Sequence, residues 1–179
     1  MIHSSSNRYA NEWEQIFKTP ANRIVCPVDD AFFRHYPANV EQTMEKLGSG
    51  QTLHILVSGT LQPRKNQLEA IRAAGLLRDH GYSVRMSLIG YDTLVPNYVQ
   101  ECRDEIIQQG LEDIVQIKGF EHEPEIYYDG TSENSCQILL CSAENESMPQ
   151  TILQAMAAGV FVVSTNCGGV AEIIKDNYN

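Results

Sequence analysis

The sequence has no apolar run long enough to cross a membrane and no apolar segment near its amino terminus. A membrane-spanning helix needs about 20 apolar residues, and a secretory signal needs an apolar region close to the start of the chain. We therefore expect a cytoplasmic protein without a membrane span. Any association with a membrane is expected to come through other parts of a longer protein.

Basic residues are scarce. There are 13 Lys and Arg residues against 23 Asp and Glu residues, which gives a formal net charge of −10. Sequence-independent binding of nucleic acid requires clustered cations that neutralise phosphates, so nucleic acid is excluded as an expected partner. A small anionic ligand needs only two or three local donors and is compatible with this charge.

Metal-binding patterns are also missing. The cysteines form no C-x-x-C pair and no ligand spacing, and no Asp-x-Asp motif occurs anywhere in the chain. We expect reduced, largely buried thiols, no metal site and no metal-bridged diphosphate chemistry. The five histidines are scattered, which favours surface or structural roles over catalytic ones.

From residue 53 onward, apolar runs of strand length alternate with segments of helical periodicity. Glycine follows several of the strands, and no repeat or coiled-coil heptad interrupts the pattern. This pattern predicts an α/β fold with a doubly wound parallel sheet. The last run is apolar on both faces, so we expect helices to cover it on both sides. Strands are expected at 53–58, 84–89, 114–117, 138–141 and 160–163, and helices at 67–80, 97–109, 123–128 and 149–159.

The first 50 residues follow a different pattern. Residues 1–8 are polar, a helix is expected over 9–18, and a short strand over 23–26. Residues 34–50 have the composition of an exposed connector that ends in Gly48-Ser49-Gly50. We therefore place a domain boundary at residue 50.

The loop after the first regular strand reads Gly59-Thr60-Leu61-Gln62-Pro63-Arg64-Lys65-Asn66. Gly59 lets the backbone approach a ligand closely. Arg64 offers a planar fork for phosphate oxygens, and Lys65 a mobile positive charge. The helix that follows adds amides that attract anions. The loop fits phosphate binding, and it also fits a solvated turn with two ordinary basic residues.

A second charged loop lies within residues 141–172. Glu144 and Glu146 follow a strand, at the edge where open α/β sheets bind ligands. Glu146 fits two roles, either accepting hydrogen bonds from a hydroxyl-rich substrate or capping the next helix. That helix start also predicts an anion site made of backbone amides. The amides are those of Ser147, Met148, Gln150 and Thr151.

Together, residues from about 24 to 179 resemble the donor-binding C-terminal domain of GT-B glycosyltransferases of group 1, the retaining family 4. Members carry a Gly-Arg-Leu or Gly-Thr-Leu loop that leads to a Lys, and residues 59–65 match the second version. Members also carry two glutamates eight positions apart, and Glu146 matches the first. Residues 25–29 resemble the family's interdomain crossing. Further matches are the helix end Ala155-Met156-Ala157-Ala158-Gly159 and the turn Gly168-Gly169-Val170-Ala171-Glu172.

The resemblance implies a hexosyltransferase that takes its sugar from a nucleotide-diphosphate sugar, with no cofactor and no metal required. Residues 1–50 would be the end of an N-terminal domain and its connector. Residues 51–179 would be the donor domain, truncated at its C-terminal end and inactive in isolation. The acceptor, a glycan or lipid-linked glycan of polysaccharide biosynthesis, would bind mostly through an N-terminal domain outside this chain.

The resemblance also assigns roles to individual residues. Arg64 and Lys65 would hold the diphosphate and stabilise the leaving group, and Glu146 would contact the donor sugar. Gly59, Thr60 and the amides near Met148 would line the same site. Main chain near Gly90, Gly119 and Phe120 would form the surface that contacts the nucleobase. Glu172 would either face the cleft or place its charge at the last helix start.

Two positions depart from the family pattern. Gln154 stands where the second glutamate usually binds the nucleotide ribose. Its amide can still accept a hydrogen bond, but without charge. Thr60 replaces the common Arg, with Arg64 as its substitute. Two other readings stay open: a related GT-B enzyme such as a sugar-nucleotide epimerase or a phosphorylase, and a non-catalytic module that binds nucleotide sugars.

Overall fold

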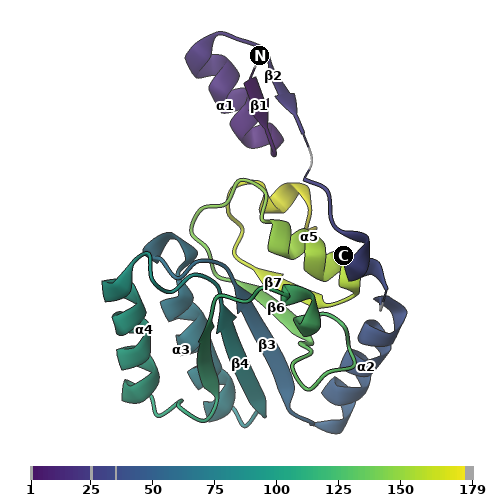
Figure 1. Ribbon diagram of the computed structural model, residues 1–179, viewed down its shortest axis with the longest axis vertical. Helices are drawn as coiled ribbons and strands as arrows, with labels where there is room; N and C mark the ends of the chain where they lie inside the picture. Colours follow the sequence, from purple (N-terminus) through teal and green to yellow (C-terminus); the bar gives the residue numbers. More distant parts are fainter. Residues whose placement is uncertain (1, 25, 35, 176–179) are drawn as a thin grey trace.

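The computed structural model describes residues 2–24, 26–34 and 36–175, which form a small N-terminal unit and a larger α/β domain (Figure 1). In the small unit, strand β1 (Ile2–Ser4) pairs in parallel with strand β2 (Ala21–Arg23), and helix α1 (Asn7–Phe17) connects the two strands along the chain. The helix expected over 9–18 is confirmed. The strand expected over 23–26 lies slightly earlier, and residue 25 is outside the described part.

The larger domain is built on a parallel sheet of five strands in the order β5-β4-β3-β6-β7. Every pairing in this sheet is parallel. The predicted α/β fold with a doubly wound parallel sheet is therefore confirmed. The strands are β3 (Leu53–Ser58), β4 (Val84–Ile89), β5 (Val115–Gly119), β6 (Ile138–Cys141) and β7 (Phe161–Ser164).

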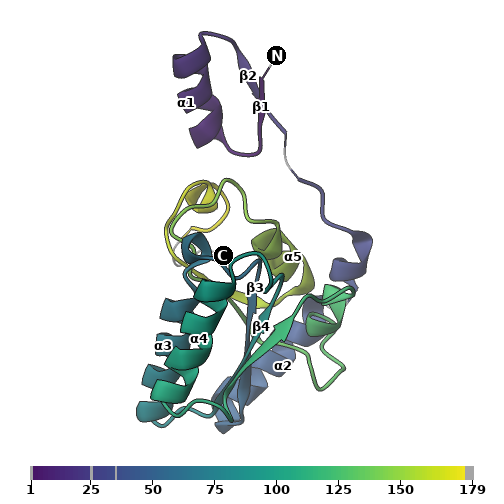
Figure 2. The ribbon, with the colours of Figure 1, turned by 60° about the vertical axis from the view of Figure 1, so that its left-hand side comes forward.

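Helices cover both faces of the sheet (Figures 1 and 2). Alternate side chains of β3 point to opposite faces, as a strand requires. Ile55 and Val57 pack under α3 and α4, whereas Leu56 belongs to the core around α5. The helices are α2 (Tyr36–Ser49), α3 (Gln67–Asp79), α4 (Pro96–Gln108) and α5 (Gln150–Ala158), with 3-10 turns at Asp30–Phe33, Pro63–Lys65, Pro124–Tyr127 and Val170–Glu172.

The exposed connector expected over 34–50 is wrong, because most of this segment is helix α2. Asn39 is 3% exposed, and its side chain donates to Tyr128 O and Ala158 O, both at 2.7 Å. The sequence did not reveal this helix because polar side chains occupy its buried face and apolar side chains occupy its exposed face. Polar Asn39 and Thr43 face the domain, whereas apolar Met44 is 58% exposed. The division of the chain at residue 50 stays a prediction.

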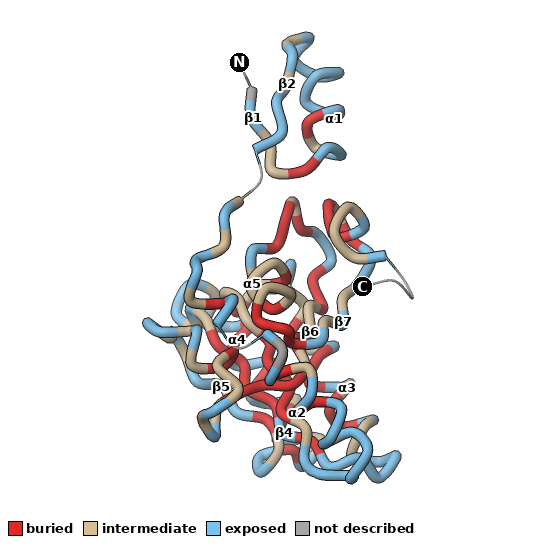
Figure 3. Tube along the Cα trace, turned by 90° about the vertical axis from the view of Figure 1, so that its right-hand side faces the viewer, coloured by how far each residue is buried: buried red, intermediate tan, exposed pale blue. Residues whose placement is uncertain are grey.

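The expectation that the last strand is covered on both sides is also wrong. β7 is an edge strand, paired on one side with β6. Phe161 is 41% exposed and Val163 is 54% exposed, so their face of β7 is largely open to solvent. Figure 3 shows buried residues concentrated in the middle of the sheet domain. An apolar sequence run alone does not distinguish an edge strand from a central one.

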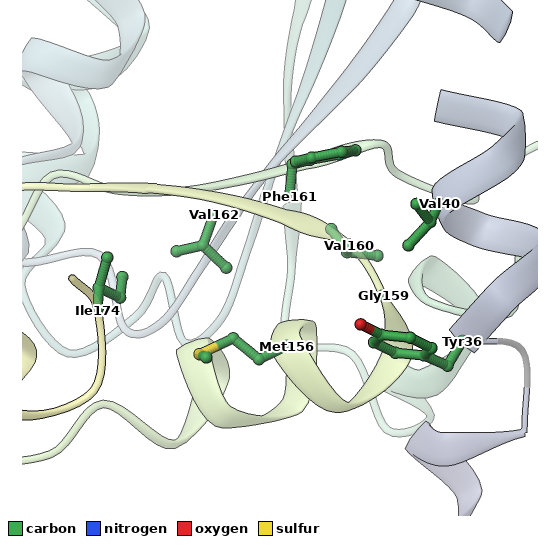
Figure 4. Close-up of a pocket in the computed structure, with 8 residues that line it drawn as sticks. All are labelled: Tyr36, Val40, Met156, Gly159, Val160, Phe161, Val162 and Ile174. Atoms are coloured by element: carbon green, nitrogen blue, oxygen red, sulfur yellow. The ribbon is translucent and has the colours of Figure 1, made fainter. Parts of the chain in front are cut away.

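An apolar pocket of about 300 Å³ lies between α2, α5 and β7 (Figure 4). It carries no charged side chain, and a diphosphate therefore finds no counter-charge there. It is lined by Tyr36, Val40, Met156, Gly159, Val160, Phe161, Val162 and Ile174.

Candidate anion-binding site

The candidate site lies where the strand order reverses. From β3 the chain moves outward through β4 to β5 and then returns to β6 on the other side of β3. Open parallel sheets bind ligands in the crevice outside the carboxyl ends of two such strands. The loops that leave β3 and β6 at this point are residues 59–66 and 142–149, the two charged loops of the sequence.

Glycines let neighbouring strand ends approach closely beside this crevice. The Gly59 amide donates to Ile89 O (2.9 Å), and the Gly90 amide donates to Gly119 O (2.8 Å). Gly90 has φ 140°, and a Cβ atom there would lie 2.2 Å from Gly59 O. Only glycine fits this position, so the ends of β3 and β4 approach each other with no side chain at residue 90 between them.

The two predicted cations converge on Glu146. Lys65 Nζ forms a short ion pair with Glu146 Oε1, and Arg64 Nη1 lies 3.4 Å from the same oxygen. Arg64 Nη1 also donates to Asn145 O (2.7 Å). Glu146 is 8% exposed, and a carboxylate this buried requires a paired cation. Glu144, by contrast, is exposed.

Backbone contacts hold these two loops together. Ser142 Oγ donates to Lys65 O (3.0 Å), and the Glu144 amide donates to Arg64 O (3.0 Å). The cations come from a loop after β3, and the carboxylate comes from a loop after β6. The site therefore depends on the pairing of those two strands.

The start of α5 supplies amides near the cations. The helix begins one residue later than expected, with Pro149 as its N-cap residue, and the Ile152 amide donates to the Pro149 carbonyl (3.1 Å). The amides of Gln150 and Thr151 belong to the first turn, where a helix offers no internal acceptor. Met148 itself is buried, with 7% of the residue exposed.

A cleft of about 490 Å³ opens between this site and the N-terminal unit. Arg64 and Ser147 face it from the sheet domain. Across the cleft's edge, Ser147 Oγ hydrogen bonds with Ser5 Oγ at 2.6 Å. The cleft is lined by His3, Ser4, Ser5, Tyr9, Trp13, Arg64, Asn145 and Ser147.

The glycine turn after β7 supports the Glu146 loop. Gly168 has φ 52°, and a Cβ atom there would lie only 1.4 Å from Glu146 O. The Gly169 amide donates to Glu146 O (3.1 Å). Glu172 lies in the first turn of the 3-10 helix Val170–Glu172, as one of its two expected roles requires, and its carboxylate also accepts hydrogen bonds from the amides of Asn7 and Arg8.

The remaining predicted residues lie around the same crevice. The Thr60 carbonyl accepts a hydrogen bond from Gln67 Nε2 (3.0 Å). Gln67 is 1% exposed and was not singled out from the sequence. Gln154 lies half-buried on α5, and its side chain makes no hydrogen bond to another residue of the described ranges.

An aromatic pair lies beyond the ends of β4 and β5. Phe120 is 46% exposed, and its ring stacks on Tyr91, with centroids 4.3 Å apart and planes inclined by 19°. Phe120 was predicted from the sequence as a site residue, whereas Tyr91 was not. The available signal was their equivalent position, since each directly follows the glycine that ends its strand.

Cys141 lies at the end of β6, next to the site. Burial raises the pKa of its thiol above the ordinary value, and this effect outweighs the hydrogen bonds that lower it. The thiol therefore stays protonated at neutral pH, which argues against a nucleophilic role. All five cysteines are free.

Among the described residues, no group of three or more His, Cys, Asp or Glu side chains is arranged to hold a metal ion. Within the same ranges, no helix is long and apolar enough to cross a membrane.

The fold and site together define a parallel α/β domain with a cationic crevice at its topological switch point. The sequence profile described as "Glycosyl transferases group 1" matches residues 39–179, more than half of the chain. The chain therefore belongs to the group 1 glycosyl transferases, the family that its sequence motifs resemble.

Two curated relatives are involved by name in polysaccharide biosynthesis. The amylovoran biosynthesis glycosyltransferase AmsK of Erwinia amylovora is 31% identical over 71% of this chain and 31% of its own length. The putative colanic acid biosynthesis glycosyltransferase WcaL of Escherichia coli K12 is 28% identical over 94% of this chain and 45% of its own length. The chain thus spans less than half the length of these relatives.

Solved structures share the fold. The structure of Anabaena HepE in complex with UDP-glucose superposes with a TM-score of 0.78 at 20% identity, covering 98% of this chain and 47% of that one. A glycosyltransferase from Rickettsia africae gives the same TM-score at 21% identity, over 98% of this chain and 46% of its own.

Proposed function

We propose that this chain is the donor-binding part of a glycosyltransferase that transfers a sugar from a nucleoside-diphosphate sugar to a glycan or lipid-linked acceptor. The observation that carries the proposal is the convergence of Arg64 and Lys65 at the topological switch point, beside glycine strand ends. The names of the relatives support polysaccharide biosynthesis as its setting.

Each part of the crevice matches one part of such a donor. The ammonium of Lys65 and the guanidinium of Arg64 would bind the diphosphate and stabilise the charge that develops on it as the sugar leaves. The first-turn amides of α5 would add to this field. Glu146, which already lies against both cations, would accept hydrogen bonds from sugar hydroxyls.

The base and ribose are assigned to the neighbouring strand ends. Backbone at Gly90 and Gly119 would lie under the nucleobase, next to the exposed ring of Phe120. Gln154, half-buried on α5, would accept a hydrogen bond from a ribose hydroxyl. Gly59 and Thr60 would contact the phosphates.

We further propose that transfer requires no metal ion. The supporting observation is that two cationic side chains and a helix start converge where a bridging metal would otherwise neutralise the diphosphate. Activity of the full-length protein that persists in excess EDTA is expected, whereas restoration of activity only by Mg²⁺ or Mn²⁺ would contradict it. A cytoplasmic location is supported by the five free thiols, which suit a reducing compartment.

The test of donor binding is titration calorimetry of this chain with UDP, GDP and ADP, followed by the Arg64→Ala variant. Binding of at least one nucleotide, weakened about tenfold or more by Arg64→Ala, is expected from the loss of a charged hydrogen bond to phosphate. Arg72→Ala is a matched control, because the Arg72 side chain is similarly exposed (46% against 47% for Arg64) and pairs on α3 and α4 with Glu69 and Glu105. Absence of binding to all three nucleotides would reject the proposal.

A second candidate is a module that binds nucleotide sugars without catalysis. The observation that favours it is Gln154, which replaces a charged residue of the family pattern. Turnover of the full-length protein distinguishes the two. In an enzyme, Arg64→Ala lowers the transfer rate by two or more orders of magnitude, as expected when transition-state charge is left unstabilised.

A further inference from the structure

Glu172 connects the two parts of the chain through its carboxylate. Oε2 accepts a hydrogen bond from the Asn7 amide (3.0 Å), and Oε1 accepts one from the Arg8 amide (3.1 Å). Arg23 Nε lies 3.9 Å from Oε2. A single side chain of the sheet domain thus contacts the start of α1 and the end of β2.

The start of α1 needs such a partner. The first amides of a helix have no acceptor within the helix, and the positive end of the helix dipole attracts a carboxylate. The Tyr9 amide is satisfied within the small unit by Ser6 Oγ (3.4 Å). The two amides before it are satisfied from outside the unit, by Glu172.

The segment that carries Glu172 also supports the Glu146 loop. Gly168 and Gly169 pack directly on the backbone of Glu146 and Ser147, where a Cβ atom at Gly169 would lie 2.0 Å from Ser147 O. The same Cβ atom would lie 2.8 Å from the Ser6 side chain. Three segments therefore meet at these glycines: the Glu146 loop, the glycine turn and the start of α1.

Among the described residues, the other side-chain hydrogen bonds between the two parts join neutral groups. They are the hydroxyl pair of Ser5 and Ser147 and a short hydrogen bond from Tyr9 OH to Asn145 Oδ1. Hydrogen bonds to a charged group are roughly twice as strong as neutral ones. The covalent connection is a single segment of chain (Figures 1 and 2).

We propose that Glu172 is a positioning residue that latches the N-terminal unit onto the sheet domain. Because the same turn supports the Glu146 loop, docking of the unit and the position of Glu146 are coupled. The latch itself is independent of ligand. Its coupling to nucleotide binding rests on the proposed function.

The latch is tested by amide hydrogen exchange of this chain and its Glu172→Ala variant. Exchange at Asn7 and Arg8 is expected to accelerate roughly tenfold, the usual effect of losing a helix cap. The Ala10 amide, which donates to Ser6 O (3.1 Å) inside the unit, is the internal reference. Far-UV circular dichroism and exchange in β3 verify that the sheet domain is folded.

A second readout follows Trp13, the only tryptophan of the chain, which lies on α1 and faces the cleft at 41% exposure. Release of the unit exposes the indole, so acrylamide quenching should increase in Glu172→Ala. Glu12→Ala is the matched control, because Glu12 pairs within α1 with Arg8 at 3.3 Å and with no other cation of the described residues. Unchanged exchange and quenching in Glu172→Ala, or equal changes in both variants, would overturn the latch.

The coupling is measured by adding UDP. In the wild-type chain, bound UDP is expected to slow exchange at Asn7 and Arg8, and this effect should be lost in Glu172→Ala. If calorimetry finds no binding of UDP, GDP or ADP, the proposed function fails while the latch still stands on the ligand-free data. If UDP binds without slowing exchange at these amides, the coupling is wrong and the donor site is unaffected.

Discussion

Lys65 and Glu146 lie 81 positions apart in the sequence and form an ion pair across the ends of β3 and β6. The carboxylate occupies the place beside both cations where a diphosphate would bind. Glu146 is therefore at once the counter-ion of the free site and the proposed contact of the donor sugar. The two roles predict opposite effects of a single substitution.

Glu146→Gln is expected to raise the affinity for a free nucleoside diphosphate while lowering sugar transfer. Neutralising the carboxylate removes a competitor for the cations, which should tighten UDP binding about threefold to tenfold on the scale of partly exposed ion pairs. Calorimetry of this chain and turnover of the full-length protein measure the two effects. Glu144→Gln, an exposed change in the same loop, is the control. Weaker UDP binding by Glu146→Gln would contradict the competition.

Removing Lys65 is expected to cost more stability than removing Arg64. The Lys65 side chain is 19% exposed and that of Arg64 47%, so water replaces the lost arginine more readily. Lys65→Met leaves a buried carboxylate less compensated and should destabilise the chain by about 1–3 kcal/mol. Arg64→Ala should cost about 1 kcal/mol or less.

Urea unfolding of Lys65→Met, Glu146→Gln and the double variant completes this test as a double-mutant cycle. The double variant is expected to recover part of the stability that Lys65→Met loses, since the buried carboxylate is then absent and the remaining Arg64 side chain is 47% exposed to water. Strict additivity of the two changes would show that the pair contributes nothing to the fold.

The sequence predicted the sheet and the two charged loops because each depends on local patterns. Strand β4 was expected at the residues where it occurs, and Arg64, Lys65 and Glu146 follow strand ends whose position periodicity and glycine reveal. Helix α2 was missed because Asn39 is buried through hydrogen bonds to residues 89 and 119 positions away. The partners of Glu172 were missed for the same reason. Such contacts appear only when distant segments are brought together.

His54 should make the fold sensitive to mild acid. It is 2% exposed on β3, with Nε2 2.9 Å from Ser87 Oγ. Burial, followed by the positive charge of Arg85, lowers its pKa to about 4 from the model-peptide value of 6.5. The unfolded state therefore binds a proton in a pH range where the folded state does not. Stability is retained above pH 6.5 and falls as the pH drops from 6.5 towards 4.

Between pH 7 and pH 5, protonation of His54 in the unfolded state should lower the free energy of unfolding by about 2 kcal/mol. Urea unfolding at the two pH values measures it in the wild-type chain and in His54→Gln. The variant is expected to lose about that much less stability over the same interval, whatever its stability at pH 7. His80→Gln, at an exposed histidine, is the control. Equal pH dependence of the wild-type chain and His54→Gln would rule out the histidine as its source.

Gly90 should tolerate no side chain, because its φ of 140° is unfavourable for other residues and its Cβ position collides with Gly59 O at 2.2 Å. Gly90→Ala combines backbone strain with displacement of the neighbouring strand end. We expect a loss of about 3 kcal/mol or more, at the upper end of single-residue effects. Gly81→Ala separates the two causes, because Gly81 has φ 83° with no atom within 4 Å of its Cβ position. Its expected cost is only about 1–2 kcal/mol, from strain alone. If chemical denaturation gives both variants the same loss, the close approach of the strand ends is not what requires glycine at residue 90.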